Sequence, residues 1–121
     1  MIDIKPFIAE KIKHLARTEL SYNENITALP VIVITETENT AVILSEGTER
    51  LTRITLQLDI YAEEVAETET IADGVSNILT EAGFRRSFSQ SLYSEEAMRK
   101  CMRFTCCIDR VHNRIVDSEE A

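Results

Sequence analysis

Glycine, proline and tryptophan are scarce in this 121-residue chain, which has three glycines, two prolines and no tryptophan. With glycines only at positions 47, 74 and 83, neither the phosphate-loop pattern G-x-x-x-x-G-K-[ST] nor the dinucleotide pattern G-x-G-x-x-G can be written. No serine stands in the G-x-S-x-G context of a hydrolase nucleophile. These absences exclude the commonest motif-based enzymes and cofactor sites, so we expect no catalytic residue and no cofactor.

Long apolar runs are also missing. The longest extend from Ala28 to Ile34, counting Pro30, and from Ala41 to Leu44. Both are far shorter than the roughly 20 residues of a membrane helix. The N-terminal residues MIDIKPF carry an acid at position 3 and lack the apolar segment of a secretory signal. We therefore expect a protein without membrane contact, made in the cytoplasm.

Cysteines are few, odd in number and crowded into one segment, as Cys101, Cys106 and Cys107. Their odd number and crowding disfavour a disulfide scaffold, and the lack of C-x-x-C spacing disfavours a thioredoxin-like motif and a zinc site. We predict free thiols, with Cys106 in the core and Cys107 as an inert thiol at a sheet edge. A metal site formed by Cys107, Asp109 and His112 is disfavoured, because residue 112 of a continuous strand faces away from residues 107 and 109.

Positive charge is in short supply, since thirteen Lys and Arg residues stand against twenty-one acids, for a net charge of −8. This balance argues against a broad nucleic-acid-binding surface, which needs clustered bases. The acids concentrate between Glu19 and Glu81, where thirteen acids accompany two bases. Between Ala82 and Val116, seven bases accompany three acids. In a monomer, this uneven charge would simply face water. In a head-to-tail ring, the acidic patch of one subunit would contact the basic patch of its neighbour.

A period-2 strand is the clearest structural signal. Between residues 51 and 62, apolar side chains alternate with polar ones over five repeats, as in a half-buried strand. An amphipathic helix over residues 63–82 follows, ended by Gly83 in a left-handed cap with Phe84 as its apolar contact. Another helix opens at Pro6. Further strands are predicted at 31–34, 41–44, 84–93 and 98–111, with polar turns at 35–40 and 45–48.

These elements predict a single α+β domain over residues 1–116, in the order α-β-β-β-α-β-β. A mainly antiparallel sheet with two helices packed on one face buries every apolar stripe. Residues 117–121 form an acidic C-terminal tail. Acids in and before the second helix favour a solvated face over a divalent-cation site, because no histidine or D-x-D-x-D-G loop accompanies them; they are Asp59, Glu63, Glu64, Glu67, Glu69 and Asp73.

The order of elements resembles the tail terminator (tail completion) proteins of long-tailed bacteriophages and prophages, in particular the small tail-to-head joining proteins of phages of Gram-positive bacteria. The resembling parts are the helix MIDIKPFIAEKIKHLA, the strand PVIVITETEN, the strand ITLQLDIYA, the helix EEVAETETIADGVSNILTEAGF and a hairpin ending in MRKCMRFTCCID. Together they cover nearly all of residues 1–111.

The resemblance implies a non-enzymatic structural protein of the virion that assembles in the host cytoplasm. Such proteins cap the head-proximal end of the tail tube as a six-fold ring, end tube polymerisation and join the tail to the head connector. The implied partners are other copies of the chain, the tail-tube protein and the head-closure or connector protein. DNA would pass through the ring without specific binding, and an acidic wall would repel its phosphates.

The resemblance transfers no individual contact residue, so candidates come from position and charge. Loops on a rigid sheet often carry binding residues. The acidic turns supply candidate partner contacts at Glu36, Glu38, Glu46, Glu49 and Arg50. The basic segment supplies candidate inter-subunit charges at Arg85, Arg86, Arg103 and Arg110.

Two other functions compete with this hypothesis. Two helices on an antiparallel sheet also describe ferredoxin-like regulatory modules, which would need a concave apolar pocket for a small molecule. An enzyme using Cys107 or the helix acids is the third alternative.

Overall fold

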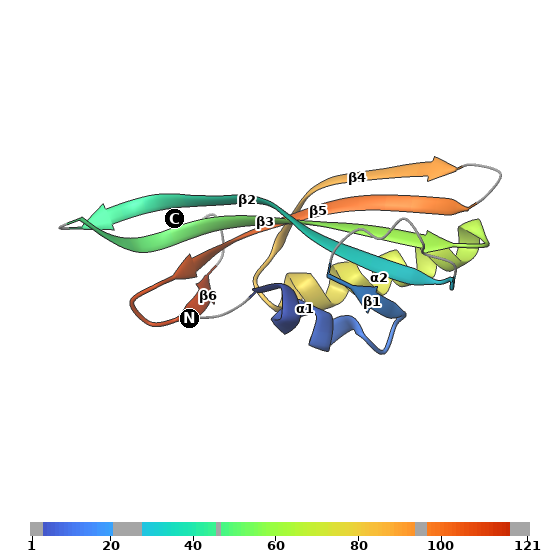
Figure 1. The fold of residues 1–121 in the computed structure, drawn as a ribbon, viewed down its shortest axis with the longest axis horizontal. Coiled ribbons are helices and arrows are strands. Elements are labelled where there is room, and N and C mark those ends of the chain that lie inside the picture. The colour runs from blue at the N-terminus through green and yellow to red at the C-terminus, as the bar shows by residue number, and fades with distance from the viewer. Residues whose placement is uncertain (1–3, 21–27, 46, 94–96, 117–121) are drawn as a thin grey trace.

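A twisted sheet packs on two helices in the computed structural model, which describes residues 4–20, 28–45, 47–93 and 97–116 (Figure 1). The order across the sheet is β1-β2-β3-β5-β4, and β6 pairs with the end of β5. Only the β1–β2 pair is parallel among the described strands. The helices are α1 (Ile4–Ile12) and α2 (Val65–Glu81), and the strands are β1 (Arg17–Glu19), β2 (Val31–Ser45), β3 (Thr48–Ala62), β4 (Arg85–Tyr93), β5 (Met98–Asp109) and β6 (Arg114–Val116).

The core lies between the helices and the face of the sheet that we call the inner face. Both helices supply apolar residues to one cluster with alternate residues of β2, β3 and β5, so the predicted α+β class and one-sided helix packing are confirmed. Full burial of each large aliphatic side chain contributes about 1.5–3 kcal/mol. The inner face consists of Ile32, Ile34, Ile54, Leu56, Leu58, Ile60, Met102, Phe104, Cys106 and Ile108.

Helix α2 ends as its sequence predicts. Gly83 has a φ of +103°, in the left-handed region that favours glycine. Its N–H donates to the carbonyl of Thr80 at 3.1 Å, and the N–H of Phe84 donates to the carbonyl of Leu79 at 2.9 Å. This is the Schellman arrangement, and Phe84 is buried in the core beside it.

Strand β2 corrects the predicted turn at 35–40. The polar residues there remain extended, so the predicted strands 31–34 and 41–44 are one strand. Its whole length pairs with β3, from Val31 opposite Tyr61 to Ser45 opposite Thr48. A shift in register between Glu36 and Glu38 accommodates an extra residue. The turn predicted around Gly47 is correct, and Gly47 has a φ of +79°.

Strand β4 also contains a register shift, between Arg86 and Phe88. Because an extra residue reverses the alternation, Phe88 pairs with Arg103 on the opposite side of the sheet from the buried Phe84. In a regular strand over the predicted range 84–93, Phe84 and Phe88 would share one face, and the register shift places them on opposite faces instead. The three-residue strands β1 and β6 were not predicted.

Candidate functional site

The sheet face turned away from the helices, which we call the outer face, is mostly polar. It consists of the alternate residues of β3 and β5 that leave the core. Strand pairing places each β3 residue from Leu51 to Ala62 opposite a β5 residue, as with Gln57 and Arg103. The outer face comprises Arg53, Thr55, Gln57, Asp59, Tyr61, Arg99, Cys101, Arg103, Thr105 and Cys107.

An ion pair anchors one end of the outer face. Arg99 donates to Oδ1 of Asp59 through Nε at 2.9 Å and Nη2 at 2.7 Å. Gln57 donates to the other carboxylate oxygen at 2.9 Å, and the Arg99 guanidinium lies 5.8 Å from the centre of the Tyr61 ring. Burial opposes the charge of Arg99, but the hydrogen bond and charge of Asp59 raise its pKa above the ordinary value. Asp59 is only 5% exposed, so this pair is held inside the polar layer.

The polar network continues across four strands. Arg103 donates to Oε1 of Gln57 at 3.1 Å and lies 4.9 Å from the centre of the Phe88 ring on β4. Thr55 shares a hydrogen bond of 2.9 Å with Thr105 and donates to Glu38 on β2, also at 2.9 Å. The layer therefore connects β2 to β4. Arginine beside aromatic rings is a composition typical of protein interfaces.

Two of the acidic candidates, Glu36 and Glu38, do not lie in a turn as predicted. Glu36 and Glu38 lie on either side of the β2 register shift, on a strand rather than a turn. Glu36 is exposed and accepts a hydrogen bond from Asn39 at 2.8 Å, whereas Glu38 is half-buried. Glu49 pairs through its backbone with Leu44 near the hairpin tip, and Arg50 is exposed. Glu46 lies outside the described residues.

The four basic candidates occupy different environments. Arg85 and Arg86 are exposed at the start of β4. Arg103 belongs to the polar network. Arg110 is half-buried and donates through Nε to the Thr52 hydroxyl at 2.8 Å, while its N–H donates to the carbonyl of Arg50. Only Arg85 and Arg86 lie side by side on the sheet edge.

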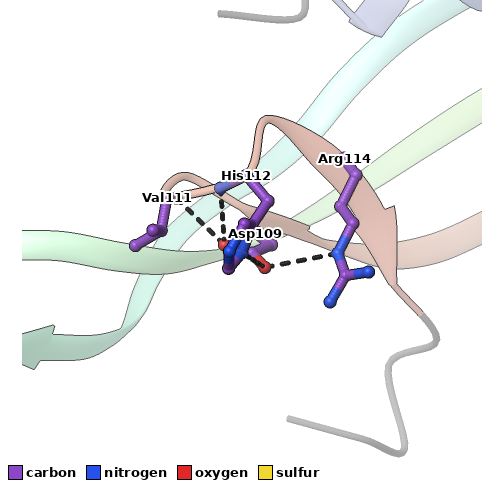
Figure 2. A network of polar contacts seen from close by, with 4 residues as sticks. All are labelled: Asp109, Val111, His112 and Arg114. Atoms are coloured by element: carbon purple, nitrogen blue, oxygen red, sulfur yellow. Dashed lines mark hydrogen bonds and ion pairs between the residues drawn. The ribbon is translucent and has the colours of Figure 1, made fainter.

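Asp109 organises the turn between β5 and β6 (Figure 2). Its carboxylate accepts the N–H groups of Val111 at 2.9 Å and His112 at 3.1 Å, and its Oδ2 lies 2.8 Å from His112 Nδ1. Arg114 donates to the same oxygen at 3.4 Å. The side-chain and backbone hydrogen bonds from His112 are the main causes that lower the pKa of Asp109 to about 2. These contacts give Asp109 a structural role in the turn.

Cys107 does not join this cluster. It is fully buried, and its strand position lies between Arg53 of β3 and Val116 of β6, so the predicted place at a sheet edge is wrong. The chain turns after Asp109 and brings His112 back to it, whereas we expected His112 on the opposite face of a longer strand. The described residues contain no group of three or more potential metal ligands among His, Cys, Asp and Glu.

All three cysteines are unbridged and buried. Cys106 lies in the core as predicted, and burial, followed by the neighbouring Cys107, raises its pKa to about 12. Burial and Asp59 likewise raise the pKa of Cys101. Thiolate character is suppressed in both residues, which disfavours them as nucleophiles.

Two further candidates are Glu69, one of the helix acids, and His14. Glu69 accepts two hydrogen bonds from Lys100, at 2.8 and 3.0 Å. His14 is exposed beyond the end of α1, near a hollow of about 430 Å³ between the two helices. The hollow is lined by Lys11, His14, Ile78, Glu81 and Ala82.

The outer-face network was not predicted as a unit, although its signal is in the sequence. The polar alternation of β3 marks Thr55, Gln57 and Asp59 as one face. Their connection to Arg99 and Arg103 depends on the β3–β5 register. That register joins residues some 40 positions apart, so no local sequence pattern predicts it.

Comparison with protein-family models gives no match, and no curated protein matches the sequence. Among the described residues, no helix has both the length and the apolar character needed to cross a membrane.

Proposed function

We propose that this chain is a structural protein of a phage or prophage tail. In this role a ring of copies caps the head-proximal end of the tail tube, ends its polymerisation and joins it to the head connector. The observation that carries the proposal is the long β2–β3 hairpin, which extends past the rest of the sheet (Figure 1).

The hairpin extends beyond the strands that support it. Strand β5 ends at Asp109, opposite Leu51 of β3, whereas β2 and β3 stay paired as far as Ser45 and Thr48. The carbonyl of Arg50 still accepts the N–H of Arg110, and beyond it the end of the hairpin has pairing only within itself among the described residues. A two-stranded ribbon is marginally stable alone. This favours an arm that is covered by a neighbouring subunit or by the tail tube.

The charge of the chain is compatible with a DNA channel. The β2–β3 region carries Glu36, Glu38 and Glu49, and the whole chain has a net charge of −8. Like charge repels phosphate and would let DNA pass without adhesion. In this proposal the acidity serves passage of DNA.

A small-molecule-binding regulatory module is the second candidate. The hollow between α1 and α2, with a volume of about 430 Å³, falls within the range of ligand pockets. Three of its five lining residues are Lys11, His14 and Glu81, so its ligand would be polar.

The genes beside this one provide the first test. Head-closure and tail-tube genes are expected, and a metabolic neighbourhood would favour the regulatory module. The second test mixes the chain with the polymerising tail-tube protein encoded beside it and measures tube lengths by electron microscopy. We expect shorter tubes with a cap at one end. Unchanged tube lengths and uncapped ends would overturn the proposal.

A matched pair of variants tests the hairpin in the same assay. Glu49→Lys changes its tip, and Glu10→Lys makes the same change on the exposed side of α1. We expect Glu49→Lys to lose capping and Glu10→Lys to retain it. Equal capping by both variants would remove the hairpin from the proposed contact.

A further inference from the structure

The sheet has two open edges among the described residues. Strand β4 pairs only with β5 at one edge. At the other edge, β1 pairs with β2 only at Val31–Val33, which leaves the rest of β2 with one neighbour, β3. An open edge presents backbone N–H and C=O groups that can pair with another strand. We propose that the first part of β4 of one copy, Arg85–Ser89, pairs with Ile34–Glu38 of β2 in a second copy, so that the sheet continues from subunit to subunit. The contact ends there, because the following rows of the sheet lead to Val31–Val33, which β1 already covers.

Strand direction agrees with this pairing. Strand β3 is antiparallel to β2, β5 is antiparallel to β3, and β4 is antiparallel to β5. Strand β4 therefore runs opposite to β2 of its own sheet. A second copy placed alongside in the same orientation puts its β2 antiparallel to β4 of the first copy. The contact is head-to-tail, which builds a ring where the rotation between copies closes.

Residues that pair from strand to strand form rows across the sheet. Two of these rows have an acid at the β2 end and an arginine at the β4 end. Glu38 pairs with Thr55, Thr55 pairs with Thr105, and Thr105 pairs with Arg85. This row crosses the sheet from an acid on the β2 edge to an arginine on the β4 edge. Repeating the sheet sideways, with no shift along the strands, brings Glu38 of one copy beside Arg85 of the next.

A second row has the same arrangement. Glu36 pairs with Leu56, Leu56 pairs with Phe104, and Phe104 pairs with Arg86. Leu56 and Phe104 belong to the inner face, whereas Thr55 and Thr105 of the first row belong to the outer face. The two charge pairs therefore form on opposite faces of the joined sheet, each with an acid and a base on the same side.

The next row adds an apolar contact. Thr35 pairs with Gln57, Gln57 with Arg103, and Arg103 with Phe88. Phe88 is 37% exposed, and the joined sheet places it beside Thr35 of the neighbour. Aromatic and β-branched residues are favourable cross-strand neighbours. Backbone hydrogen bonds would supply affinity, and the two charge pairs would select the register.

This inference rests on the proposed function only in requiring a second copy of the chain. Two double variants test it. Glu36→Arg with Glu38→Arg makes both edges basic, and Arg85→Glu with Arg86→Glu makes both edges acidic. We expect the native chain to self-associate at millimolar concentration and low salt, as measured by analytical ultracentrifugation. Each double variant should associate at least tenfold more weakly, and an equimolar mixture of the two should regain association.

Matched controls separate the edges from general charge effects. Glu10→Arg with Glu81→Arg changes two exposed acids outside both edges and should leave association unchanged. Cysteines at positions 38 and 85 of one chain should form a ladder of disulfide-linked copies on oxidation, and cysteines at 10 and 85 should not. Melting temperatures and circular dichroism of each variant establish that it is folded.

Three results would overturn the pairing: a native chain that stays monomeric under these conditions, two charge variants that associate as the native chain does, or a mixture that fails to regain association. Tube capping reports on the proposed function separately. If the charge variants lose association but still cap tubes, the proposed function stands, and the strand pairing is a property of the free protein only. If the mixture of charge variants regains association but the native chain leaves tubes uncapped, the strand pairing stands and the proposed function is wrong.

Discussion

The two faces of the sheet are built from alternate residues of the same strands, yet they hold together differently. On the inner face, Leu56 and Phe104 are fully buried among aliphatic side chains from both helices. On the outer face, Asp59 is 5% exposed and is held by Arg99 and Gln57. The inner face gains stability from apolar burial without direction, whereas the outer face depends on particular donors and acceptors.

This difference indicates a division of roles. The apolar face attaches the helices to the sheet, and the polar face connects neighbouring strands to one another. Glu38 contacts Thr55 on one side, and Arg103 contacts both Gln57 and Phe88 on the other, so the outer-face contacts taken together involve every strand from β2 to β4. These are the strands at the proposed subunit contact. Substitutions on the inner face should therefore change stability most, and those at the edges should change association most.

The largest expected effect is on the inner face. Leu56→Ala or Leu58→Ala should lower the free energy of unfolding by about 2–5 kcal/mol, because each removes fully buried methyl groups and leaves a cavity. Thr55→Ala, one residue away on the outer face, should cost about 1 kcal/mol through its lost hydrogen bonds. Urea denaturation measures both changes. Melting temperatures of the leucine variants within a degree of the native chain would show that the assigned faces are reversed.

The second prediction concerns the Asp59–Arg99 pair. Asp59→Ala should cost about 1–3 kcal/mol, since the Arg99 side chain, 34% exposed, can still be hydrated. Arg99→Met should cost more, because it leaves the carboxylate of Asp59, whose side chain taken alone is 8% exposed, without its charged partner. The double variant should cost less than the sum of the two in a denaturation cycle. Equal costs for the single variants would mean that Gln57 alone satisfies Asp59.

Alternation and end signals predicted much of the fold. The five-repeat pattern of β3 and the Gly83–Phe84 end of α2 depend on residues close in sequence, and both appear where expected. The turn predicted at 35–40 failed because its polar residues also fit an edge strand, and pairing with β3 decides between the two. Strands β1 and β6, with three residues each, exist only through partners elsewhere in the chain.

The proposed subunit contact uses residues that the sequence had suggested as candidates, but its geometry could not be predicted from the sequence. Charge counting identified Glu36, Glu38, Arg85 and Arg86. Placing them in two matched rows requires the register of three strand pairs and the shifts in β2 and β4. Arg103 and Arg110 carry the same charge as Arg85 and Arg86, and they donate hydrogen bonds to Gln57 and Thr52 of their own subunit. Charge alone cannot separate these roles.

A smaller effect is expected at the β5–β6 turn. The folded state lowers the pKa of Asp109 to about 2 from an ordinary 3.8, so the carboxylate stabilises the fold above about pH 4. That contribution is lost as the pH falls through the folded pKa. Asp109→Asn should be less stable than the native chain at pH 7, and the difference should shrink between pH 4 and 2. A gap in urea midpoint that stays constant down to pH 2 would contradict this role.

The smallest effect on the free energy of unfolding is expected at the β4 edge. Charge reversals there distinguish arginines at the proposed subunit contact from arginines that stabilise the subunit itself. Arg86→Glu should change the free energy of unfolding by no more than about 0.5 kcal/mol, because the side chain is exposed. Arg103→Glu and Arg110→Glu should cost more, since they disrupt contacts with Gln57, Phe88 and Thr52. All four reversals, Arg85→Glu included, should weaken association more than neutral surface changes do. For Arg86 that loss should come without a change in melting temperature. If reversal at both positions leaves association intact while reversal at Arg103 abolishes it, the subunit contact lies on the outer face and the edges are not joined.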